Sequence, residues 1–285
     1  SIDCGNGAAG VVAKDVYERL GCNVIELYGE PDGSFPNHHP DPSKLENMED
    51  LIKSVKENKC SVGLAFDGDA DRLGVISPIG EMIFPDRQMI MFSRQVIQSS
   101  PNAKIVFDVK CSKLLSDEIK KLKGKPLICK TGHTFIKQKI RETDALLGGE
   151  MSGHIFFNDR WPGFDDGIYA GARMLEIIAN SEEDDQFATV PYMLSTPEIN
   201  IPAADEEKFQ IVKTFIENSN FSDAKILSID GIRVEFEKGW GLLRPSNTSP
   251  CLVLRFEAET NDDLKKIKEI FYLGLKSIKP NINKF

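Results

Sequence analysis

Residues 65–74 read A-F-D-G-D-A-D-R-L-G and carry three aspartates at alternate positions. The apolar runs 62–66 and 73–76 lie on either side of this loop and predict a strand before it and another after it. Alternate carboxylates on one short turn converge on a single point, which is the arrangement that a hard divalent cation requires of oxygen ligands. The candidate metal ligands are Asp67, Asp69 and Asp71.

Magnesium fits this loop better than calcium does. A calcium-binding EF-hand loop starting at Asp67 would need Gly at its sixth position and Glu at its twelfth, where this sequence has Arg72 and Pro78. Mg²⁺ uses few carboxylates and leaves its other positions to water or to a phosphate oxygen. The Arg72 guanidinium can hold an anion beside such an ion. The alternative interpretation is an acidic surface turn, since D-G-D runs are common in turns.

Composition describes a globular protein and limits its partners. A length of 285 residues allows two or three domains, and 41% hydrophobic with 28% charged residues is typical of soluble chains. The formal net charge of -9 argues against a broad surface for nucleic acid or an anionic membrane. No segment is long and apolar enough to cross a bilayer. Six cysteines without a C-x-x-C motif predict buried thiols in a reducing cytoplasm, where we expect the protein.

Two segments of the chain share one order of predicted elements. Residues 1–66 read strand, helix, strand, helix and strand before the acidic loop, and residues 104–147 read the same way before G-G-E-M-S-G-H at 148–154. Asp3 and Asp108 fall at equivalent points of the two segments. The repeat predicts an α/β fold with two related α/β sandwich domains and mixed sheets. Their loops would lie at equivalent strand ends, where open α/β sheets bind ligands.

The pattern changes near residue 196. Half-buried antiparallel strands and two helices are expected there, with strands at 196–201, 225–229, 232–237 and 251–258 and helices at 205–218 and 261–278. This predicts a C-terminal α+β domain with an antiparallel sheet and helices. The expected domains are residues 1–82, 83–192 and 193–285, with an acidic linker at 181–186.

The stretch Gly5 to Gly10 matches G-x-G-x-x-G between a strand and a helix, which is typical of a dinucleotide site. Glu26, at the end of the next strand, could bind the ribose. The proline-rich loop that begins at Gly29 disfavours this interpretation, and a tight turn into a helix is simpler. An NAD-dependent oxidoreductase remains an alternative function on this motif.

A second polar loop carries Glu150, Ser152 and His154 between glycines. A carboxylate accepts hydrogen bonds from two sugar hydroxyls, a serine adds a donor or acceptor, and a histidine transfers protons near neutral pH. K-T-G-H at 130–133 follows another strand and suits an anion or a sugar. Ordinary polar turns are the alternative for both loops. His38 and His39 have no nearby ligand partners and are expected at the surface.

The third polar loop is R-P-S-N-T-S-P at residues 244–250. One guanidinium stands beside a dense set of hydroxyl and amide groups, and the prolines stiffen the turn. Such donors can wrap a dianionic phosphate. A loop without a ligand is the alternative.

Together, the three loops resemble the motifs of the α-D-phosphohexomutase superfamily, most closely its phosphomannomutase/phosphoglucomutase branch. D-G-D-A-D-R is similar to that family's metal loop, G-E-M-S-G-H to its sugar-binding loop and R-P-S-N-T-S-P to its phosphate-binding loop. The loops occur in family order. Met151 and Asn247 favour this branch over phosphoglucosamine mutase, which remains an alternative.

The resemblance implies an enzyme that interconverts hexose 1-phosphate and hexose 6-phosphate, with mannose or glucose as the sugar. The family's reaction passes through an active-site phosphoserine and a bisphosphorylated sugar. It implies Mg²⁺ on the three aspartates and glucose 1,6-bisphosphate as activator and intermediate. Arg72 would steady the phosphoserine, and His154 would transfer a proton. The substrate-binding residues that it implies are Lys110, His133, Glu150, Ser152, Arg244, Ser246, Asn247 and Thr248.

One family motif is absent, the serine loop of the form T-[AS]-S-H-N-P, of which N-H-H-P at 37–40 is only a superficial echo. We therefore expect the chain to match the second, third and fourth family domains, to lack the N-terminal serine domain and to be inactive alone. Its expected partners are hexose phosphates and that missing domain. Two further alternatives are a phosphatase of the haloacid dehalogenase type with Asp67 as nucleophile, and a catalytically inactive sugar-phosphate-binding module.

Overall fold

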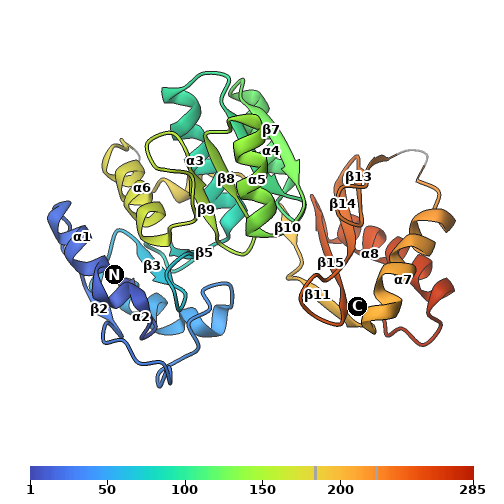
Figure 1. The fold of residues 1–285 in the computed structure, drawn as a ribbon, viewed down its shortest axis with the longest axis horizontal. Coiled ribbons are helices and arrows are strands. Elements are labelled where there is room, and N and C mark those ends of the chain that lie inside the picture. The colour runs from blue at the N-terminus through green and yellow to red at the C-terminus, as the bar shows by residue number, and fades with distance from the viewer. Residues whose placement is uncertain (183–184, 222–223) are drawn as a thin grey trace. The chain divides into compact units, whose positions relative to one another are not determined.

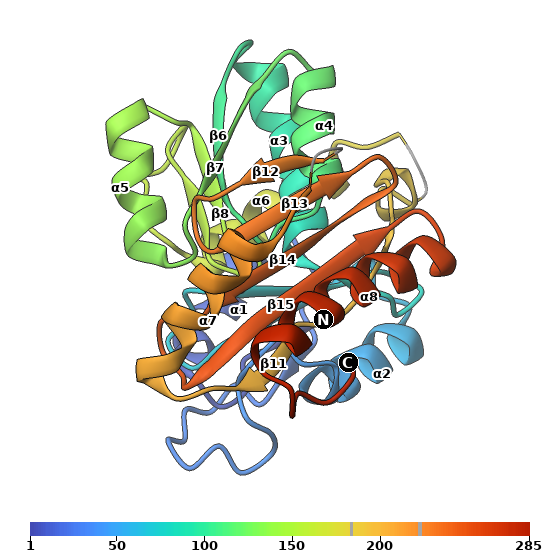
Figure 2. The ribbon, with the colours of Figure 1, turned by 90° about the vertical axis from the view of Figure 1, so that its right-hand side faces the viewer.

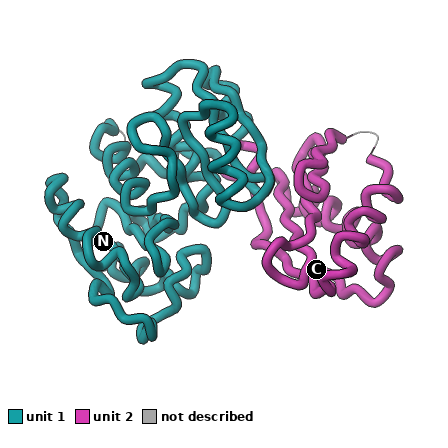
Figure 3. Tube along the Cα trace, viewed as in Figure 1, with its two compact units in different colours: residues 1–111, 115–191 teal, residues 112–114, 192–285 magenta. Residues whose placement is uncertain are grey.

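The computed structural model describes residues 1–182, 185–221 and 224–285, which form two compact units (Figure 3). Unit 1 comprises Ser1–Cys111 and Leu115–Pro191, and unit 2 comprises Ser112–Leu114 and Tyr192–Phe285. Unit 1 contains two sheets and unit 2 contains one. Residues 183–184 of the expected acidic linker lie outside the described residues.

The first sheet of unit 1 has the strand order β2-β1-β3-β4-β5. Strands β1, β2 and β3 are parallel, β4 pairs antiparallel with β3, and β5 pairs antiparallel with β4, so the sheet is mixed. Phe66 lies opposite Leu73 in the β3–β4 pair, so the acidic residues between them form the hairpin loop. The strands are β1 (Ile2–Asp3), β2 (Glu26–Leu27), β3 (Gly63–Phe66), β4 (Leu73–Ile76) and β5 (Met82–Ile83).

Short helices connect these strands, namely η1 (Ala8–Val11), α1 (Ala13–Arg19), η2 (Leu45–Met48) and α2 (Glu49–Asn58). The second helix expected within residues 1–66 begins with a 3₁₀ turn, because η2 directly precedes α2. Strands β3 and β4 are buried along their whole length. Such burial on both faces explains their continuous apolar sequences.

The second sheet of unit 1 repeats the topology of the first, with the order β7-β6-β8-β9 (Figure 1). Strands β6, β7 and β8 are parallel and β9 is antiparallel. The predicted repeat is confirmed, since Asp3 ends β1 and Asp108 ends the equivalent β6. The strands are β6 (Lys104–Asp108), β7 (Lys125–Cys129), β8 (Leu147–Gly149) and β9 (Ile155–Phe157).

Four helices belong to this second sheet: α3 (Pro85–Ser99), α4 (Lys113–Lys121), α5 (His133–Thr143) and α6 (Gly167–Ala179). The sequence pattern did not assign α3 or α6. Phe92 of α3 packs edge-on against Phe157 of β9, with ring centroids 5.1 Å apart. Both rings are fully buried, which contributes about 2 kcal/mol or more each to stability.

Unit 2 is a six-stranded antiparallel sheet, with α7 (Asp205–Asn218) and α8 (Asn261–Ile278) packed on one face (Figure 2). The predictions for both helices and for β15 (Cys251–Ala258) are confirmed at their bounds. The strand expected at 196–201 is present only from residue 199 onward, as β11, and β14 was not predicted. The other strands are β10 (Leu194–Ser195), β11 (Ile199–Pro202), β12 (Lys225–Leu227), β13 (Ile232–Phe236) and β14 (Gly239–Pro245).

All six cysteines are free thiols. The expectation that all are buried is wrong for Cys22, Cys60 and Cys251, which are only partly covered. Among the described residues, no helix combines the length and the apolar character needed to span a membrane.

Candidate functional site

The metal loop, defined here as residues 67–72, connects β3 to β4. Asp67, Asp69 and Asp71 each offer an oxygen, and these atoms lie within 4.8 Å of one another. Ala70 adopts a left-handed backbone conformation with φ of 64°, which tightens the turn. The local backbone therefore brings together the three predicted ligands.

The electrostatics of the loop fit a divalent cation. Burial raises the pKa of Asp71 to about 6, and the neighbouring carboxylates of Asp67 and Asp69 add to this shift. The Asp71 Oδ1 atom is buried and makes no hydrogen bond with any described residue. A cation at this point would neutralise the crowded charges and satisfy that oxygen.

Arg72 is held among carboxylates at the end of the metal loop. Its Nε lies 2.5 Å from Asp67 Oδ2, and its backbone N–H donates to Asp67 Oδ1 at 3.0 Å. Its Nη1 lies 3.6 Å from Asp41 Oδ1. About a quarter of the side chain remains exposed, so part of the guanidinium can reach an anion. Both Asp67 oxygens accept bonds from Arg72, which argues against Asp67 as a free nucleophile.

The glycine turn supports the metal loop. Ala8 N–H donates to Gly68 O at 2.9 Å, and a Cβ on Gly7 would lie 2.7 Å from the same oxygen. A Cβ on Gly10 would overlap the carbonyl group of Gly29. The protein's own backbone thus fills the space that these glycines leave. The structure favours the tight-turn interpretation over a dinucleotide site.

His38 is not a free surface residue, and that expectation is wrong. Its Nε2 lies 3.0 Å from Oδ2 of Asp3, and its Nδ1 lies 3.0 Å from the His39 carbonyl oxygen. Asp3 is only 1% exposed and also accepts a bond from Gly5 N–H. Two residues further on, Pro40 contacts Gly5. The proline-rich loop is therefore anchored against the glycine turn.

The sugar loop, defined here as residues 150–154, is a closed turn between β8 and β9. Glu150 N–H donates to His154 O at 3.0 Å, and Gly153 N–H donates to Glu150 O at 3.1 Å. Leu73 N–H donates to Gly153 O at 3.1 Å, and Arg72 forms an isolated β-bridge with His154. The metal loop and the sugar loop, more than eighty positions apart in sequence, therefore meet within unit 1.

Glu150 is a buried acid, only 2% exposed. Its Oε1 accepts a hydrogen bond from Gly132 N–H at 2.6 Å. Burial raises the pKa of Glu150 to about 7, and the buried Asp108 carboxylate adds to the shift. Ser152, two residues on, is partly exposed. The pair can offer a carboxyl group and a hydroxyl to a ligand.

His154 lies between two carboxylates. Its Nδ1 is 3.1 Å from Asp165 Oδ2 and 3.4 Å from Asp71 Oδ1. Burial lowers the pKa of His154, but these carboxylates outweigh it and the net shift is upward. A histidine so placed can exchange a proton near neutral pH.

Asp165 is a site residue that the sequence did not single out. It follows the aromatic stretch after β9, and the paired acids D-D at 165–166 were its only signal. Its Oδ2 also lies 3.3 Å from His133 Nδ1, and its Oδ1 accepts from Lys137 Nζ at 3.0 Å. Burial opposes ionisation, yet the hydrogen bond from Lys137 and the nearby His154 ring hold the Asp165 pKa below its usual value.

Two predicted phosphate-binding residues lie close to the sugar loop, near Asp108. Lys110 is 6% exposed, and its Nζ lies 3.9 Å from Asp108 Oδ2. His133 is half exposed at the start of α5, with its ring centroid 5.5 Å from that of His154. Thr131 and Met151 both donate to Asp108, at 3.2 and 3.4 Å. The buried Asp108 therefore connects these segments.

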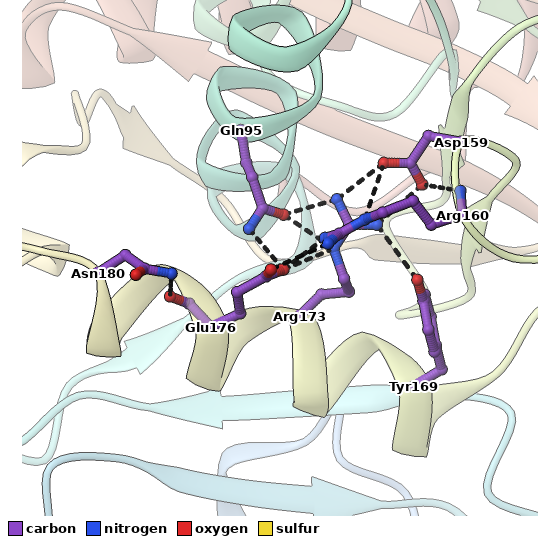
Figure 4. A network of polar contacts seen from close by, with 7 residues as sticks. All are labelled: Gln95, Asp159, Arg160, Tyr169, Arg173, Glu176 and Asn180. Carbon is purple, nitrogen blue, oxygen red and sulfur yellow. Dashed lines mark hydrogen bonds and ion pairs between the residues drawn. The ribbon is translucent and has the colours of Figure 1, made fainter. Parts of the chain in front are cut away.

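A buried polar network positions the segment that carries Asp165 (Figure 4). Arg173 on α6 donates from Nη1 and Nη2 to the two Asp159 oxygens at 2.8 and 3.0 Å. It also bonds Gln95 of α3 and stacks on the Phe157 ring at 4.2 Å. Asp159 begins the segment and Asp165 ends it, so this network fixes one end of the segment.

The predicted phosphate turn lies in unit 2. Arg244 and Pro245 are not turn residues as expected, since both belong to β14. Arg244 is 4% exposed, its Nε donates to Asp230 Oδ2 at 2.8 Å, and its Nη2 makes no hydrogen bond within the described residues. Ser246 Oγ accepts from Thr248 N–H at 3.3 Å, which closes the turn. Asn247 and Thr248 are exposed.

Family models match three consecutive segments of the chain. Residues 1–80 match "Phosphoglucomutase/phosphomannomutase, alpha/beta/alpha domain II", and residues 84–189 match domain III of the same family. Residues 198–273 match its C-terminal domain.

Individual relatives agree with these matches. The phosphomannomutase/phosphoglucomutase of Pseudomonas syringae is 52% identical over 99% of this chain and 61% of the relative, and the phosphoglucomutase of Neisseria gonorrhoeae is 49% identical over 97% and 61%. A crystal structure of a phosphoglucomutase/phosphomannomutase family protein from Burkholderia thailandensis matches with a TM-score of 0.94 and 44% identity, over 100% of this chain and 61% of that one. The chain thus spans about three-fifths of these relatives, and it belongs to the phosphoglucomutase/phosphomannomutase family of α-D-phosphohexomutases.

Proposed function

We propose that this chain supplies the metal, sugar and phosphate loops of an enzyme that interconverts hexose 1-phosphate and hexose 6-phosphate. The observation that carries the proposal is the pairing of the metal loop with the sugar loop, through the Arg72–His154 bridge. This places a carboxylate cluster beside a buried acid and a histidine. Relatives that are about 50% identical to this chain are named phosphomannomutase/phosphoglucomutase and phosphoglucomutase, which supports glucose and mannose as the sugars.

The metal loop is the proposed Mg²⁺ site, with Asp67, Asp69 and Asp71 as ligands. The bound ion would offset the negative charge of a transferring phosphoryl group. Arg72 would lie beside that phosphoryl group, and in family terms it would steady the phosphoserine. Asp67 would keep its backbone bond from Arg72, which fixes the turn.

The sugar loop is proposed to orient the hexose and to move a proton. Glu150 and Ser152 would bind sugar hydroxyls, which a carboxylate can do in more than one orientation of the ring. His154 would accept or donate the proton of the hydroxyl that exchanges phosphate. Asp165 and Asp71 next to it would stabilise its protonated form.

The non-reacting phosphate is proposed to bind cationic and hydroxyl groups. Lys110 and His133 would contribute from unit 1. In unit 2, a phosphate would bind Arg244 and the turn after it, where a guanidinium N–H is buried without a partner in the described chain. The turn residues proposed for this role are Ser246, Asn247 and Thr248.

The proposed reaction also needs a phosphoserine nucleophile. No T-[AS]-S-H-N-P stretch occurs in this sequence. We therefore propose that the purified chain binds sugar phosphate but does not turn it over. Sustained conversion of glucose 1-phosphate to glucose 6-phosphate by the chain alone would contradict this part of the proposal.

The direct test is calorimetric titration of the chain in Mg²⁺ with glucose 1,6-bisphosphate and, separately, with NAD. Glu150→Ala and Arg244→Ala should each weaken sugar-phosphate binding by about tenfold or more, since each removes a buried hydrogen-bonding group. The matched control is Glu142→Ala on the exposed side of α5. NAD binding that both substitutions leave unchanged would overturn the proposal in favour of the glycine turn.

A further inference from the structure

A second cluster of metal-binding side chains adjoins the metal loop. Asp71, His154 and Asp165 each offer one atom, and these three atoms also lie within 4.8 Å of one another. The residues come from three separate segments, the metal loop, the sugar loop and the segment before α6. Asp71 is common to both clusters.

The spacing of these atoms suits a small tetrahedral ion. His154 Nδ1 lies 3.1 Å from Asp165 Oδ2 and 3.4 Å from Asp71 Oδ1. An ion that binds nitrogen and oxygen at about 2.0–2.1 Å in tetrahedral geometry separates its ligands by about 3.3 Å. Both distances fall close to that value, and the third separation, between the Asp71 and Asp165 oxygens, is within 4.8 Å.

Two atoms of the cluster lack a hydrogen bond. His154 Nδ1 and Asp71 Oδ1 are both inaccessible to solvent, and neither makes a hydrogen bond with any described residue. The oxygens Asp165 Oδ2 and Asp71 Oδ1 lie near this nitrogen, but neither contact has the angles of a hydrogen bond. A metal ion bound among the three atoms would satisfy His154 Nδ1 and Asp71 Oδ1 at once, whereas a single proton cannot satisfy both atoms.

The remaining oxygen of Asp165 is already held. Its Oδ1 accepts from Lys137 Nζ at 3.0 Å, which leaves Oδ2 directed at the two histidines. Arg72 Nε is 4.0 Å from Asp71 Oδ1, too far for a hydrogen bond. Neither Lys137 nor Arg72 therefore occupies the carboxylate oxygens, Asp165 Oδ2 and Asp71 Oδ1, that a metal ion would bind.

The donor set differs in kind from that of the metal loop. Three carboxylates suit Mg²⁺, whereas an imidazole with two carboxylates favours Zn²⁺, Co²⁺ and similar ions. Three protein ligands also leave a fourth position open to water or to a phosphate oxygen.

We propose that Asp71, His154 and Asp165 form a site for a transition-metal ion of the Zn²⁺ class, which adjoins the Mg²⁺ loop and shares Asp71 with it. An ion bound there occupies His154 and withdraws it from proton transfer, so the site is inhibitory. The inference goes beyond the proposed function, and metal binding at the cluster can be measured without any turnover.

The test uses Co²⁺ as a spectroscopic probe of the whole chain, in an excess of Mg²⁺ that saturates the metal loop. We expect one equivalent of Co²⁺ to give the intense visible absorption of a tetrahedral N/O site, without a thiolate charge-transfer band. Asp165→Asn and His154→Asn should each weaken this binding by about tenfold or more, since each removes one of three ligands. Zn²⁺ should displace Co²⁺.

The matched control is Asp69→Asn, which alters the metal loop alone and should keep the Co²⁺ spectrum. Circular dichroism checks that each variant is folded. If one of the two ligand variants does not fold, the other still tests the proposal. A Co²⁺ spectrum unchanged in both variants, or lost in Asp69→Asn, would overturn the proposal. Glucose 1,6-bisphosphate titration in Mg²⁺ alone tests the proposed function separately on the same samples.

Discussion

Glu150 shows how a residue proposed to bind the substrate can reduce stability. Its buried carboxyl group has a pKa raised to about 7, by burial first and by Asp108 second. Between the usual value of 4.5 and about 7, the folded state binds more protons than the unfolded state. Stability therefore falls as the pH rises through this range. The ionised carboxylate therefore reduces the stability of the folded state at neutral pH.

Glu150→Gln is therefore expected to stabilise the chain above neutral pH, by up to about 3 kcal/mol at pH 8, and to make little difference at pH 5. Glutamine keeps an oxygen that can accept from Gly132 N–H. Urea denaturation at both pH values measures the difference. Glu142→Gln, at an exposed position of α5, is the control. A gain in stability of the same size at both pH values in Glu150→Gln would contradict the titration argument.

Gly7 contributes through close backbone approach. A Cβ there would lie 2.7 Å from Gly68 O, a backbone atom of the metal loop that cannot move freely. Gly7→Ala should displace the loop, cost about 1–3 kcal/mol of stability and weaken Mn²⁺ binding several-fold. Gly33→Ala is the control, because a Cβ at Gly33 meets no atom within 4 Å. Paramagnetic water relaxation measures Mn²⁺ affinity, and equal affinities in both variants would contradict the argument.

The proline-rich loop over residues 29–42 is an element without regular structure that is nevertheless fixed. Its anchor is the ion pair of His38 with the buried Asp3. Burial lowers the pKa of His38, but the His39 carbonyl and Asp3 outweigh it and the net pKa is raised. The stabilisation is thus fully present below the usual pKa of 6.5 and is lost as the pH rises through the folded-state value.

His38→Gln should destabilise the chain by about 1–3 kcal/mol at pH 6 and by less at pH 8. Glutamine can donate to Asp3 but carries no charge. Thermal denaturation at both pH values gives the comparison, with the exposed His39→Gln as control. A larger loss at pH 8 than at pH 6 would contradict the ion-pair explanation.

Periodicity predicted the elements that alternate strongly, and it failed where burial removes alternation. Helices α7 and α8 are amphipathic and were placed at their bounds. Helix α3 buries polar residues such as Asp86, Arg87 and Gln88 together with its apolar ones, so its buried face is not marked by apolar residues alone. Strand β14 is buried throughout, contains two glycines and ends in proline, and so resembles a loop in sequence. The repeat was predictable because both copies keep the same turns.

The convergence of the three candidate metal ligands, which are close in sequence, was predictable, whereas the position of Asp165 was not. Asp67, Asp69 and Asp71 lie on one loop, so spacing alone brings them together. Asp165 reaches His154 through the fold of a separate segment held by Arg173. His38 likewise meets Asp3 only because β1 and its loop are packed together. A local sequence pattern does not predict such contacts between residues of separate segments.

On the scale of the whole molecule, the candidate functional residues are divided between two compact units. The metal and sugar loops belong to unit 1, and the phosphate turn belongs to unit 2. Unit 1 has two sheets and unit 2 has one, and each unit has its own buried apolar residues. Sequence composition alone does not predict that the first two expected domains form one unit. Hydrogen bonds between their loops join them, and α6 also packs on β3 and β4.

Because unit 2 has its own core, damage to that core should leave metal binding in unit 1 intact. Phe271 of α8 is fully buried and packs against the rings of Phe215 and Phe256. Phe271→Ala should cost about 3–5 kcal/mol, enough to unfold unit 2 at moderate temperature. Leu273→Ala, at an exposed position two residues along α8, is the matched control.

Hydrogen exchange measured by mass spectrometry separates the outcomes. In Phe271→Ala we expect fast exchange over β11 to β15, with protection of β3, β4, β6 and β8 unchanged. Mn²⁺ affinity should also remain within about twofold of the unsubstituted chain, because its ligands all lie in unit 1. Loss of protection in β3 and β6 together with loss of Mn²⁺ binding would instead mean that the two units unfold as one cooperative structure. The phosphate turn would then depend on unit 1 for its stability, although it contributes no residue to the metal loop.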